Sequence, residues 1–553
     1  MKNKNLIINL LIVLAGALFF IPGIGSARLF DWDEINFAES AREMLVTGDW
    51  LNVRINFESF WEKPPLFIWM QALSMKVFGV GEFAARFPNA LIGIITLLVL
   101  FNVGRKAEDT RFGLMWALMY LISFLPFFYF KSGIIDPWYN IFIFLSIYFF
   151  ALYTYPSEKS CRMANAALSA LFMGLAINTK GPVAFLVFGL SFVVWLAFRK
   201  FRLDFRWKDV GVYVLVLALT GGAWFIVLAL TGHGDVIQDF IDYQVRLFQT
   251  KDAGHGGFPL YHFVILLFGV TPASFFALST FRKSALKDEQ PESRLAVLFR
   301  WMMVSFWVVL ILFSIVRTKI IHYSSFCYFP MTFLAAFAAT RMMDGKLRFT
   351  GWQKGLLIGT AAVYGIAFTG FTLLDKFKHL IIPYIHDPFA VSCMEAEASW
   401  KGFEPVIGII LLGCTIAFVV LFSKRKNTAA FACLAAGNLF FILTAMYSAV
   451  PEAEKYSQAS AVEFYIDRKG EDCYIKPAYF KSYAHYFYSD RQPQNACDDF
   501  EFLSTGPIDK PCYFVVKDMP KRVERLKREV PQAQFLYRRS GFQFFVRPMP
   551  AEE

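Results

Sequence analysis

Charged side chains are scarce in this chain of 553 residues: Asp, Glu, Lys and Arg together make up only 18% of it, while hydrophobic residues make up 56%. A soluble domain carries more charge and could not bury as many as 64 phenylalanines. Apolar runs of roughly 18 to 22 residues, the length that crosses a bilayer, recur along the chain. The composition therefore argues against a soluble protein and predicts an integral membrane protein with many helical spans.

Motifs of several common enzyme classes are also missing. No Walker phosphate loop, no GxGxxG dinucleotide fingerprint and no HExxH zinc motif stands in a suitable context, so we expect no nucleotide, flavin or zinc-protease chemistry. The net charge of +11 would indicate nucleic acid in a soluble chain. Here the positive-inside bias of cytoplasmic loops accounts for it, and no nucleic-acid partner is expected.

Cysteine is sparse, with eight residues in the whole chain. Cys473, Cys497 and Cys512 stand near the C-terminus, and Cys393 stands in a connection that is assigned below to the outer face. An oxidising compartment would allow a disulfide among these four, and the sequence does not choose the pairing. The other cysteines lie in or beside apolar runs and are expected to be packing residues.

The apolar runs predict about thirteen spans, and we interpret the first, at 6–26, as a retained anchor. Lys and Arg cluster in alternate connections, which places those connections in the cytoplasm with the N-terminus inside. The connections 27–87, 131–136, 232–258 and 376–402 then lie outside, together with the tail. The other expected spans are 88–104, 112–131, 136–154, 162–180, 182–199, 209–231, 259–281, 299–317, 319–341, 355–375, 403–423 and 428–448.

The tail differs in kind from the rest of the chain. It mixes short β-like runs at 473–475 and 512–516 with polar segments, and a basic stretch at 521–528 has a helical pattern. The sequence therefore predicts two units. These are a membrane domain over 1–448, whose first outer loop spans 27–87, and a small α/β domain over 449–553 on the outer face.

The stretch 28–86 within the first outer loop holds nine acidic and six basic residues in an otherwise apolar chain. Apolar residues recur at helical spacing from Asp33 to Val46, and Gly48 ends this pattern. Pro64 and Pro65 open a second helix with one apolar side. We expect these helices to lie in the membrane interface, the first with its polar side toward solvent.

Acidic and basic residues at the outer boundary are the candidate functional groups. Asp33 and Asp136 could orient a polar acceptor and take its proton, because an acid at a membrane boundary indicates a functional site. Each also fits a plain helix N-cap. Basic residues around one membrane-edge cavity would suit a lipid-linked phosphate, although such residues at span ends are more often interface anchors. They belong to two groups, Tyr243, Arg246, Lys251 and His255, and Ser314, Arg317, Lys319, His322 and Tyr323.

A series of short motifs runs through the first outer loop: Asp33-Glu34, Ala41-Arg42-Glu43-Met44, Gly48-Asp49-Trp50, Glu62-Lys63-Pro64-Pro65-Leu66 and Arg86-Phe87-Pro88. This series resembles the bacterial aminoarabinose-transferase and protein-mannosyltransferase group of membrane glycosyltransferases, which share the GT-C fold. The resemblance implies a polytopic helical protein of the bacterial inner membrane, with its active site on the periplasmic face.

The resemblance also implies site residues. A sugar would pass from a polyprenyl phosphate carrier, such as undecaprenyl phosphate, to a lipid or protein acceptor. Asp33 is the expected base or acceptor-positioning group, and Asp136 matches the second catalytic acid. Lys63 matches the lysine that contacts the carrier phosphate, and Arg246 resembles its arginine partner. The other expected substrate-binding residues are Glu34, Arg42, Arg86, His255, Lys319 and Tyr323.

A divalent metal is a further implication of the resemblance. Glu62 matches a residue that, with a histidine, binds a metal near the carrier in the aminoarabinose enzymes. The chain departs from that pattern, because Ile241 stands five residues before Arg246, where the histidine is expected. His255 or His233 would have to substitute for it.

The leading hypothesis is therefore an inverting glycosyltransferase that moves a sugar from a polyprenyl phosphate to an envelope glycolipid such as lipid A. A protein acceptor is the nearest alternative. A lipid or sugar transporter is the competing class, because many spans with intramembrane charges also suit transport, but no internal repeat supports it.

Overall fold

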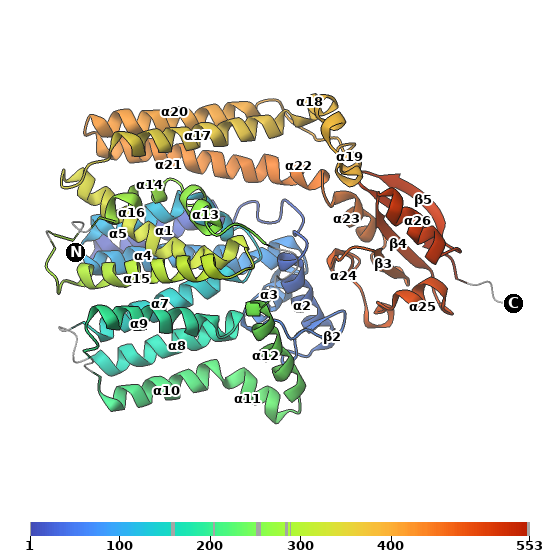
Figure 1. Cartoon of the computed structure of the whole chain (residues 1–553), viewed down its shortest axis with the longest axis horizontal. Helices are drawn as coiled ribbons and strands as arrows, with labels where there is room; N and C mark the ends of the chain where they lie inside the picture. The colour runs from blue at the N-terminus through green and yellow to red at the C-terminus, as the bar shows by residue number, and fades with distance from the viewer. Residues whose placement is uncertain are drawn as a thin grey trace.

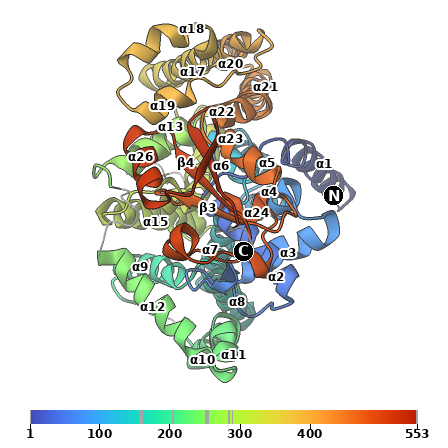
Figure 2. The same cartoon turned by 90° about the vertical axis from the view of Figure 1, so that its right-hand side faces the viewer.

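The computed structural model describes residues 2–155, 161–202, 205–249, 256–282, 286–287 and 289–549. Long helices lie side by side in a bundle, and a small α/β unit is attached at one end of it (Figure 1). The helices α2 (Asp33–Thr47) and α3 (Leu66–Phe78) of the first outer loop lie between the bundle and this unit. Figure 2, seen from the α/β end, shows α17, α20 and α21 on one side of the bundle and α10 and α11 on the opposite side.

Each expected span coincides with a helix or with consecutive helices. Within the described ranges, seven helices are long and apolar enough to cross a membrane, or nine if each bent pair is one span. The chain is therefore a multi-pass membrane protein, and the count of thirteen stays a prediction. The helices are α1 (Lys2–Phe20), α4 (Glu82–Ala107), α5 (Thr110–Leu121), α6 (Phe124–Tyr129), α7 (Asp136–Tyr153), α8 (Arg162–Lys180), α9 (Val183–Phe198), α10 (Trp207–Gly221), α11 (Ala223–Leu230), α13 (Tyr261–Gly269), α14 (Ala273–Ala277), η3 (Leu278–Thr280), α15 (Arg294–Ile315), η4 (Ile321–Cys327), α16 (Tyr328–Met343), α17 (Gly351–Thr372), α20 (Glu404–Ser423) and α21 (Asn427–Thr444).

Two expected spans are bent pairs of helices. The axes of α10 and α11 meet at 55°, and those of α13 and the helix after it meet at 108°. Pro272 stands in the second break and has no N–H to donate to a continuous helix. The segment 259–281 therefore turns back sharply, where the sequence pattern predicted a straight span.

The outer connections carry short elements. Strands β1 (Arg54–Ile55) and β2 (Glu58–Ser59) form an antiparallel hairpin in the first outer loop. Gly48 ends α2 in a left-handed conformation and Pro65 opens α3, as the sequence predicted. The later outer segments are α12 (Gly234–Gln249), α18 (Leu374–Ile381), η5 (Ile382–Tyr384) and α19 (Pro388–Cys393).

The last membrane helix runs further than its expected border at 448. Helix α21 continues through the π-helical turn η6 (Ala445–Ala449) into α22 (Val450–Lys455). Beyond it, four strands form a sheet in the order β3-β4-β6-β5, in which β3 and β4 are parallel and the other pairs antiparallel. The elements are α23 (Ala459–Ile466), β3 (Tyr474–Ala478), α24 (Ala484–Tyr488), η7 (Pro493–Asn495), α25 (Phe500–Thr505), β4 (Cys512–Lys517), α26 (Pro520–Glu529), β5 (Gln534–Arg539) and β6 (Phe542–Arg547). The division of the chain into two domains at 449 stays a prediction.

The first outer loop and the tail share one hydrophobic core. Ile35 and Phe37 of α2 belong to the same buried cluster as Phe464 of α23 and Phe544 of β6. Every residue of α2 from 34 to 44 is buried. The expectation of an interfacial helix with a polar side in solvent is therefore wrong for α2, because the tail covers that side.

The cysteines form no disulfide: all eight are free. Cys512 pairs in register with Tyr474, the residue after Cys473. Successive side chains of a strand point to opposite faces of a sheet, and the two cysteines accordingly belong to different core clusters. The pleat thus keeps Cys473 and Cys512 apart, and a disulfide among the four outer cysteines is not formed.

Candidate active site

The two expected catalytic acids meet at the short helix η4, although they begin different helices. Asp33 is the first residue of α2, and its Oδ2 lies 3.0 Å from Nε2 of His322. Asp136 is the first residue of α7, and its Oδ1 lies 3.5 Å from Ser325 Oγ, whose hydroxyl donates to the carbonyl of His322 at 2.6 Å. His322 and Ser325 are three residues apart on η4. One helical turn therefore connects both acids.

Neither acid acts as the N-cap that the local sequence also allowed. The cap positions are held by Trp32 and Ile135, and no side-chain capping bond forms at either helix. Asp136 instead pairs with Lys180, the last residue of α8, at 2.7 Å between Oδ1 and Nζ. The Asp136 side chain is 3% exposed, whereas that of Asp33 is 47% exposed. Asp33 is thus the acid that a substrate can reach.

The electrostatic surroundings keep Asp33 ionised. Burial raises the pKa of Asp33, but the hydrogen bond with His322 and the charges of His322, Lys180 and Lys63 outweigh this and lower it to about 2. A carboxylate with so low a pKa holds a hydroxyl by accepting its hydrogen bond, and it removes the proton only when the hydroxyl has become strongly acidic.

Lys63 and Arg246 both lie over one aromatic ring. Lys63 Nζ lies 5.0 Å from the ring centroid of Tyr243, and Arg246 Cζ lies 5.3 Å from it. The indole of Trp61 packs edge-on against the same tyrosine at 5.4 Å. Helix α12 thus brings Arg246 to the first outer loop, and two cations stand together as a phosphate site requires.

Several proteins of known sequence and structure are similar to this chain. Residues 62–224 match the family model of dolichyl-phosphate-mannose-protein mannosyltransferase. The crystal structure of ArnT from Cupriavidus metallidurans bound to undecaprenyl phosphate superposes with a TM-score of 0.77 at 18% identity, covering 97% of each chain. The chain has the GT-C fold. An archaeal oligosaccharyltransferase, AglB from Archaeoglobus fulgidus, has a TM-score of 0.53 at 11% identity and covers 100% of this chain and 75% of its own.

Curated relatives are undecaprenyl phosphate-alpha-4-amino-4-deoxy-L-arabinose arabinosyl transferases. That of Edwardsiella ictaluri (strain 93-146) is 26% identical over 359 residues, which are 63% of this chain. The match likewise spans only 63% of that relative's length. That of Pectobacterium carotovorum is 24% identical over 461 residues, covering 81% of this chain and 76% of the relative. The resemblance drawn from the first outer loop is thereby confirmed.

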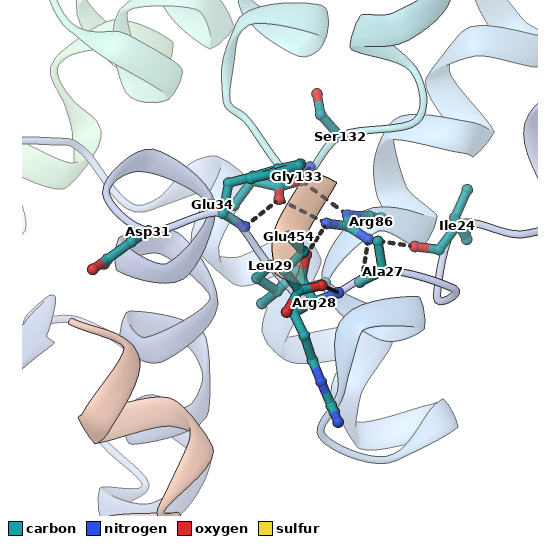
Figure 3. A network of polar contacts seen from close by, with 12 residues as sticks. Ile24, Ala27, Arg28, Leu29, Asp31, Glu34, Arg86, Ser132, Gly133 and Glu454 are labelled. Carbon is teal, nitrogen blue, oxygen red and sulfur yellow. Dashed lines mark hydrogen bonds and ion pairs between the residues drawn. The ribbon is translucent and has the colours of Figure 1, made fainter. Parts of the chain in front are cut away.

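Within this GT-C fold, Glu34 and Arg86 pair with each other. The guanidinium of Arg86 donates to both carboxylate oxygens of Glu34, at 2.9 and 2.8 Å, and both side chains are buried. The remaining donors of Arg86 reach the carbonyls of Ile24, Ala27 and Arg28, and Glu34 also accepts from the backbone of Gly133 (Figure 3). This network clamps the first outer loop onto α4, and its geometry favours a structural role over the predicted contact with substrate.

Arg42 joins the first outer loop to the tail. It donates to both carboxylate oxygens of Glu39, at 2.8 and 2.6 Å, and to Asp490 at 3.0 Å. Its side chain is only 1% exposed. A buried arginine that already binds two acids favours a structural link between the first outer loop and the tail. The predicted contact with substrate stays without geometric support.

Lys319, Tyr323 and His255 complete the predicted set. Lys319 Nζ donates to the carbonyls of Phe313, Ser314 and Val316 at 2.6 to 2.8 Å, which caps the C-terminus of α15. Tyr323 directly follows His322 in sequence, and its ring centroid lies 5.3 Å from that of Phe313. His255 lies outside the described residues.

Within the described part of the chain, the donor set around Glu62 does not fit a resident metal. Among the residues that the structure describes, no group of three His, Cys, Asp or Glu side chains could hold a metal ion. Ile241, at the position where a histidine would be expected, is 49% exposed and offers no ligand atom. A metal at Glu62 therefore stays a prediction, and no step below depends on it.

Lys180, His322 and Ser325 are site residues that the sequence analysis did not assign. Lys180 ends its span on the side predicted to face outward, against the positive-inside bias, and this mismatch could have marked it as a candidate. His322 was noted only as a neighbour of Lys319. Nothing in the local sequence connects Ser325 to Asp136, because the contact depends on how α7 and η4 pack.

Proposed function

We propose that the chain is a glycosyltransferase that moves a sugar from undecaprenyl phosphate to an envelope glycolipid such as lipid A, on the periplasmic face of the bacterial inner membrane. The observation that carries the proposal is the constellation at η4. A reachable, ionised acid, Asp33, feels the charge of Lys63, and Lys63 shares the ring of Tyr243 with Arg246, so that two cations are available for a phosphate leaving group. The arabinosyl transferase relatives support the donor class.

The proposed reaction is a single displacement at the anomeric carbon. The acceptor oxygen forms a bond to this carbon while the bond from the carbon to the phosphate oxygen breaks. Asp33 holds the acceptor hydroxyl, and the pair of Asp33 and His322 takes its proton as the new bond forms. The polyprenyl phosphate leaves as an anion, so it needs no proton, and Lys63 and Arg246 stabilise its charge. A single displacement inverts the anomeric configuration.

Asp136 has a different part in this proposal. Because it is buried and paired with Lys180, it orients Lys180 and η4 and does not touch the acceptor. The lysine in turn adds positive charge beside Asp33. Asp136 is thus a positioning residue, and its loss would act through His322 and Lys180.

A protein acceptor is the second candidate, favoured by the family model of protein mannosyltransferases that matches residues 62–224. It would use the same displacement, with a serine or threonine hydroxyl as the nucleophile.

The proposal is tested by reconstituting the protein in vesicles with undecaprenyl phosphate-4-amino-4-deoxy-L-arabinose and lipid A. Mass spectrometry should detect one added sugar for wild type. For Asp33→Asn we expect kcat to fall roughly 100- to 10,000-fold, because the neutral amide is a poor proton acceptor, while the thermal unfolding midpoint stays unchanged.

Asp387→Asn is the matched control, because Asp387 is an exposed acid in a later outer connection and asparagine caps α19 equally well. It should transfer sugar like wild type. Full transfer by Asp33→Asn would rule out the catalytic assignment. Sugar found on a peptide but never on lipid A would move the proposal to the protein acceptor.

A further inference from the structure

A large cleft lies between the first outer loop and the tail, apart from the contacts described so far. Its volume is about 870 Å³, and its two walls are the β1–β2 hairpin with the residues that follow it and the segment from β3 to α24 with parts of α25 and α26. Ligand pockets of this size commonly occur where two units meet. The cleft lies next to the proposed phosphate site, because Glu62 lines it while the next residue, Lys63, stands over Tyr243.

The lining combines aromatic faces with short polar groups. Phe60, Trp61 and Tyr483 supply rings, and Asn56, Glu58 and Ser59 supply amide, carboxylate and hydroxyl groups. Aromatic faces accept the apolar C–H face of a sugar ring, and mixed donors and acceptors match its hydroxyls. The lining is thus that of a site for a polyhydroxylated ring compound.

His485 is a second observation that points to a ligand. Its side chain is only 2% exposed and lines the cleft, yet neither ring nitrogen has a hydrogen-bond partner among the described residues. A buried polar group without a partner destabilises the fold unless a ligand supplies one. Burial and the nearby charges of Arg491 and Lys476 lower the pKa of His485 well below its ordinary value, so the ring is neutral. A neutral imidazole offers one donor and one acceptor, which suits a hydroxyl.

The cleft is poorly suited to an extended peptide. Peptides commonly bind by adding a strand to a free sheet edge, and β3 is the edge strand beside the cleft. Pro477 in β3 has no N–H to donate, and the carbonyl of Ile475 already accepts from Arg491. The edge is therefore closed to a peptide backbone.

The far wall of the cleft leads to Asp33. Lys481 Nζ lies 5.0 Å from the ring centroid of Trp32 and 5.1 Å from that of Tyr483. Trp32 immediately precedes Asp33, and its positive φ of 84° turns the chain there. A ligand in the cleft can thus extend past Lys481 to the catalytic carboxylate, and an exposed lysine on this path suits an anionic substituent.

We propose that this cleft binds the saccharide head group of the acceptor, held by the aromatic walls and by His485, with an anionic substituent at Lys481. The acceptor is then a phosphorylated glycolipid and not a protein. This inference rests on the proposed function for its link to transfer, but saccharide binding by the cleft is measurable without any transfer.

The test uses two variants of the full-length protein, His485→Phe and Lys481→Ala, with intact lipid A and with its deacylated disaccharide bisphosphate as probes. Phenylalanine preserves the ring shape and removes the unpartnered nitrogens, so we expect an unfolding midpoint at or above that of wild type. For each variant the KM for lipid A should rise about tenfold, which is about 1.4 kcal/mol, while the KM for the sugar donor stays unchanged. His386→Phe and Lys527→Ala are matched controls on exposed residues away from the cleft and should behave like wild type.

The binding arm omits the donor and follows the disaccharide by its effect on tryptophan fluorescence. Binding to wild type that weakens in both variants supports the inference, even if no transfer occurs, in which case only the proposed function fails. Transfer with unchanged acceptor KM in both variants overturns the inference and leaves the proposed function intact. Binding of intact lipid A without any binding of the disaccharide, or competition by a serine-containing peptide alone, also overturns it.

Discussion

Asp33 and Asp136 have the same side chain and the same place at the start of a helix, but their surroundings separate their roles. Asp33 is half exposed and pairs with His322, whereas Asp136 is buried and neutralised by Lys180. Local sequence suggested the same two readings for both acids, a cap or a catalytic group. Exposure and charge partners, which sequence does not contain, support the proposal that Asp33 contacts the substrate and that Asp136 is a positioning residue.

The pair of Glu34 and Arg86 should contribute to the stability of the fold. Replacing Arg86 by Met leaves the Glu34 carboxylate buried without its partner, which should destabilise the protein by roughly 3–5 kcal/mol. The double variant Arg86→Met/Glu34→Gln should regain only part of this loss, because three backbone carbonyls lose their donor in both. Thermal unfolding of the detergent-solubilised protein measures this. An unchanged midpoint with a raised donor KM would instead support the contact with substrate that the sequence predicted.

At the scale of elements, the membrane helices approach one another through small residues. A Cβ atom on Gly113 of α5 would collide with the carbonyl oxygen of Phe101 in α4 and lie 2.9 Å from the amide nitrogen of Arg105. Gly365 and Gly408 form a similar contact between α17 and α20. Small residues allow backbones to approach closely where lipid gives no hydrophobic drive for helices to associate.

Gly113→Ala is therefore expected to push α4 and α5 apart. Both helices lead toward the site, because α4 begins just before Arg86 and α5 precedes the turn to Asp136. We expect a loss of stability of about 1–3 kcal/mol from overpacking, together with reduced transfer. Gly189→Ala in α9, where a Cβ meets nothing within 4 Å, is the control and should be neutral or stabilising. Equal unfolding midpoints for the two variants would contradict this packing.

At the scale of the whole molecule, the contact between the first outer loop and the tail holds a cluster of buried charges. Glu39, Arg42 and Glu43 are buried on α2, and Arg42 pairs with Asp490 of the tail. Burial and the neighbouring charge of Glu39 raise the pKa of Glu43 to about 9. The folded protein thus keeps one proton at Glu43 that an unfolded chain, with its ordinary pKa of 4.5, releases.

The sign of the pH dependence follows from that proton. Between about pH 5 and 9 the folded state binds more protons than the unfolded state, so stability should fall as the pH rises through this window and level off above it. The unfolding midpoint, recorded from pH 5 to 9, should fall less steeply in Glu43→Gln, which cannot titrate. Glu501→Gln, an exposed acid of α25, is the control and should keep the wild-type slope. A midpoint that rises with pH in wild type alone would show that Glu43 is ionised in the fold.

The sequence alone was enough to predict the membrane class, the positions of the helices and the candidate residues of the first outer loop. These depend on apolar run length, on Gly and Pro at element ends, and on contiguous motifs, all of which are local. It also placed Lys63 and Arg246 in one site through the family resemblance. It missed the bend at Pro272 and the burial of α2, because neither the angle between helices nor the cover supplied by a distant segment is a local property.

Only the tertiary structure decided which charges meet. His322 contacts Asp33 although hundreds of residues separate them in sequence, and Lys180 contacts Asp136 across tens of residues. Glu34, Arg42 and Lys319 likewise hydrogen-bond to groups of the protein itself. A charged side chain in a sequence has no preferred partner until packing lowers the local dielectric and fixes distances, since both set the strength of an ion pair. The sequence could therefore name the chemistry of this site, while packing decided which acid is exposed to perform it.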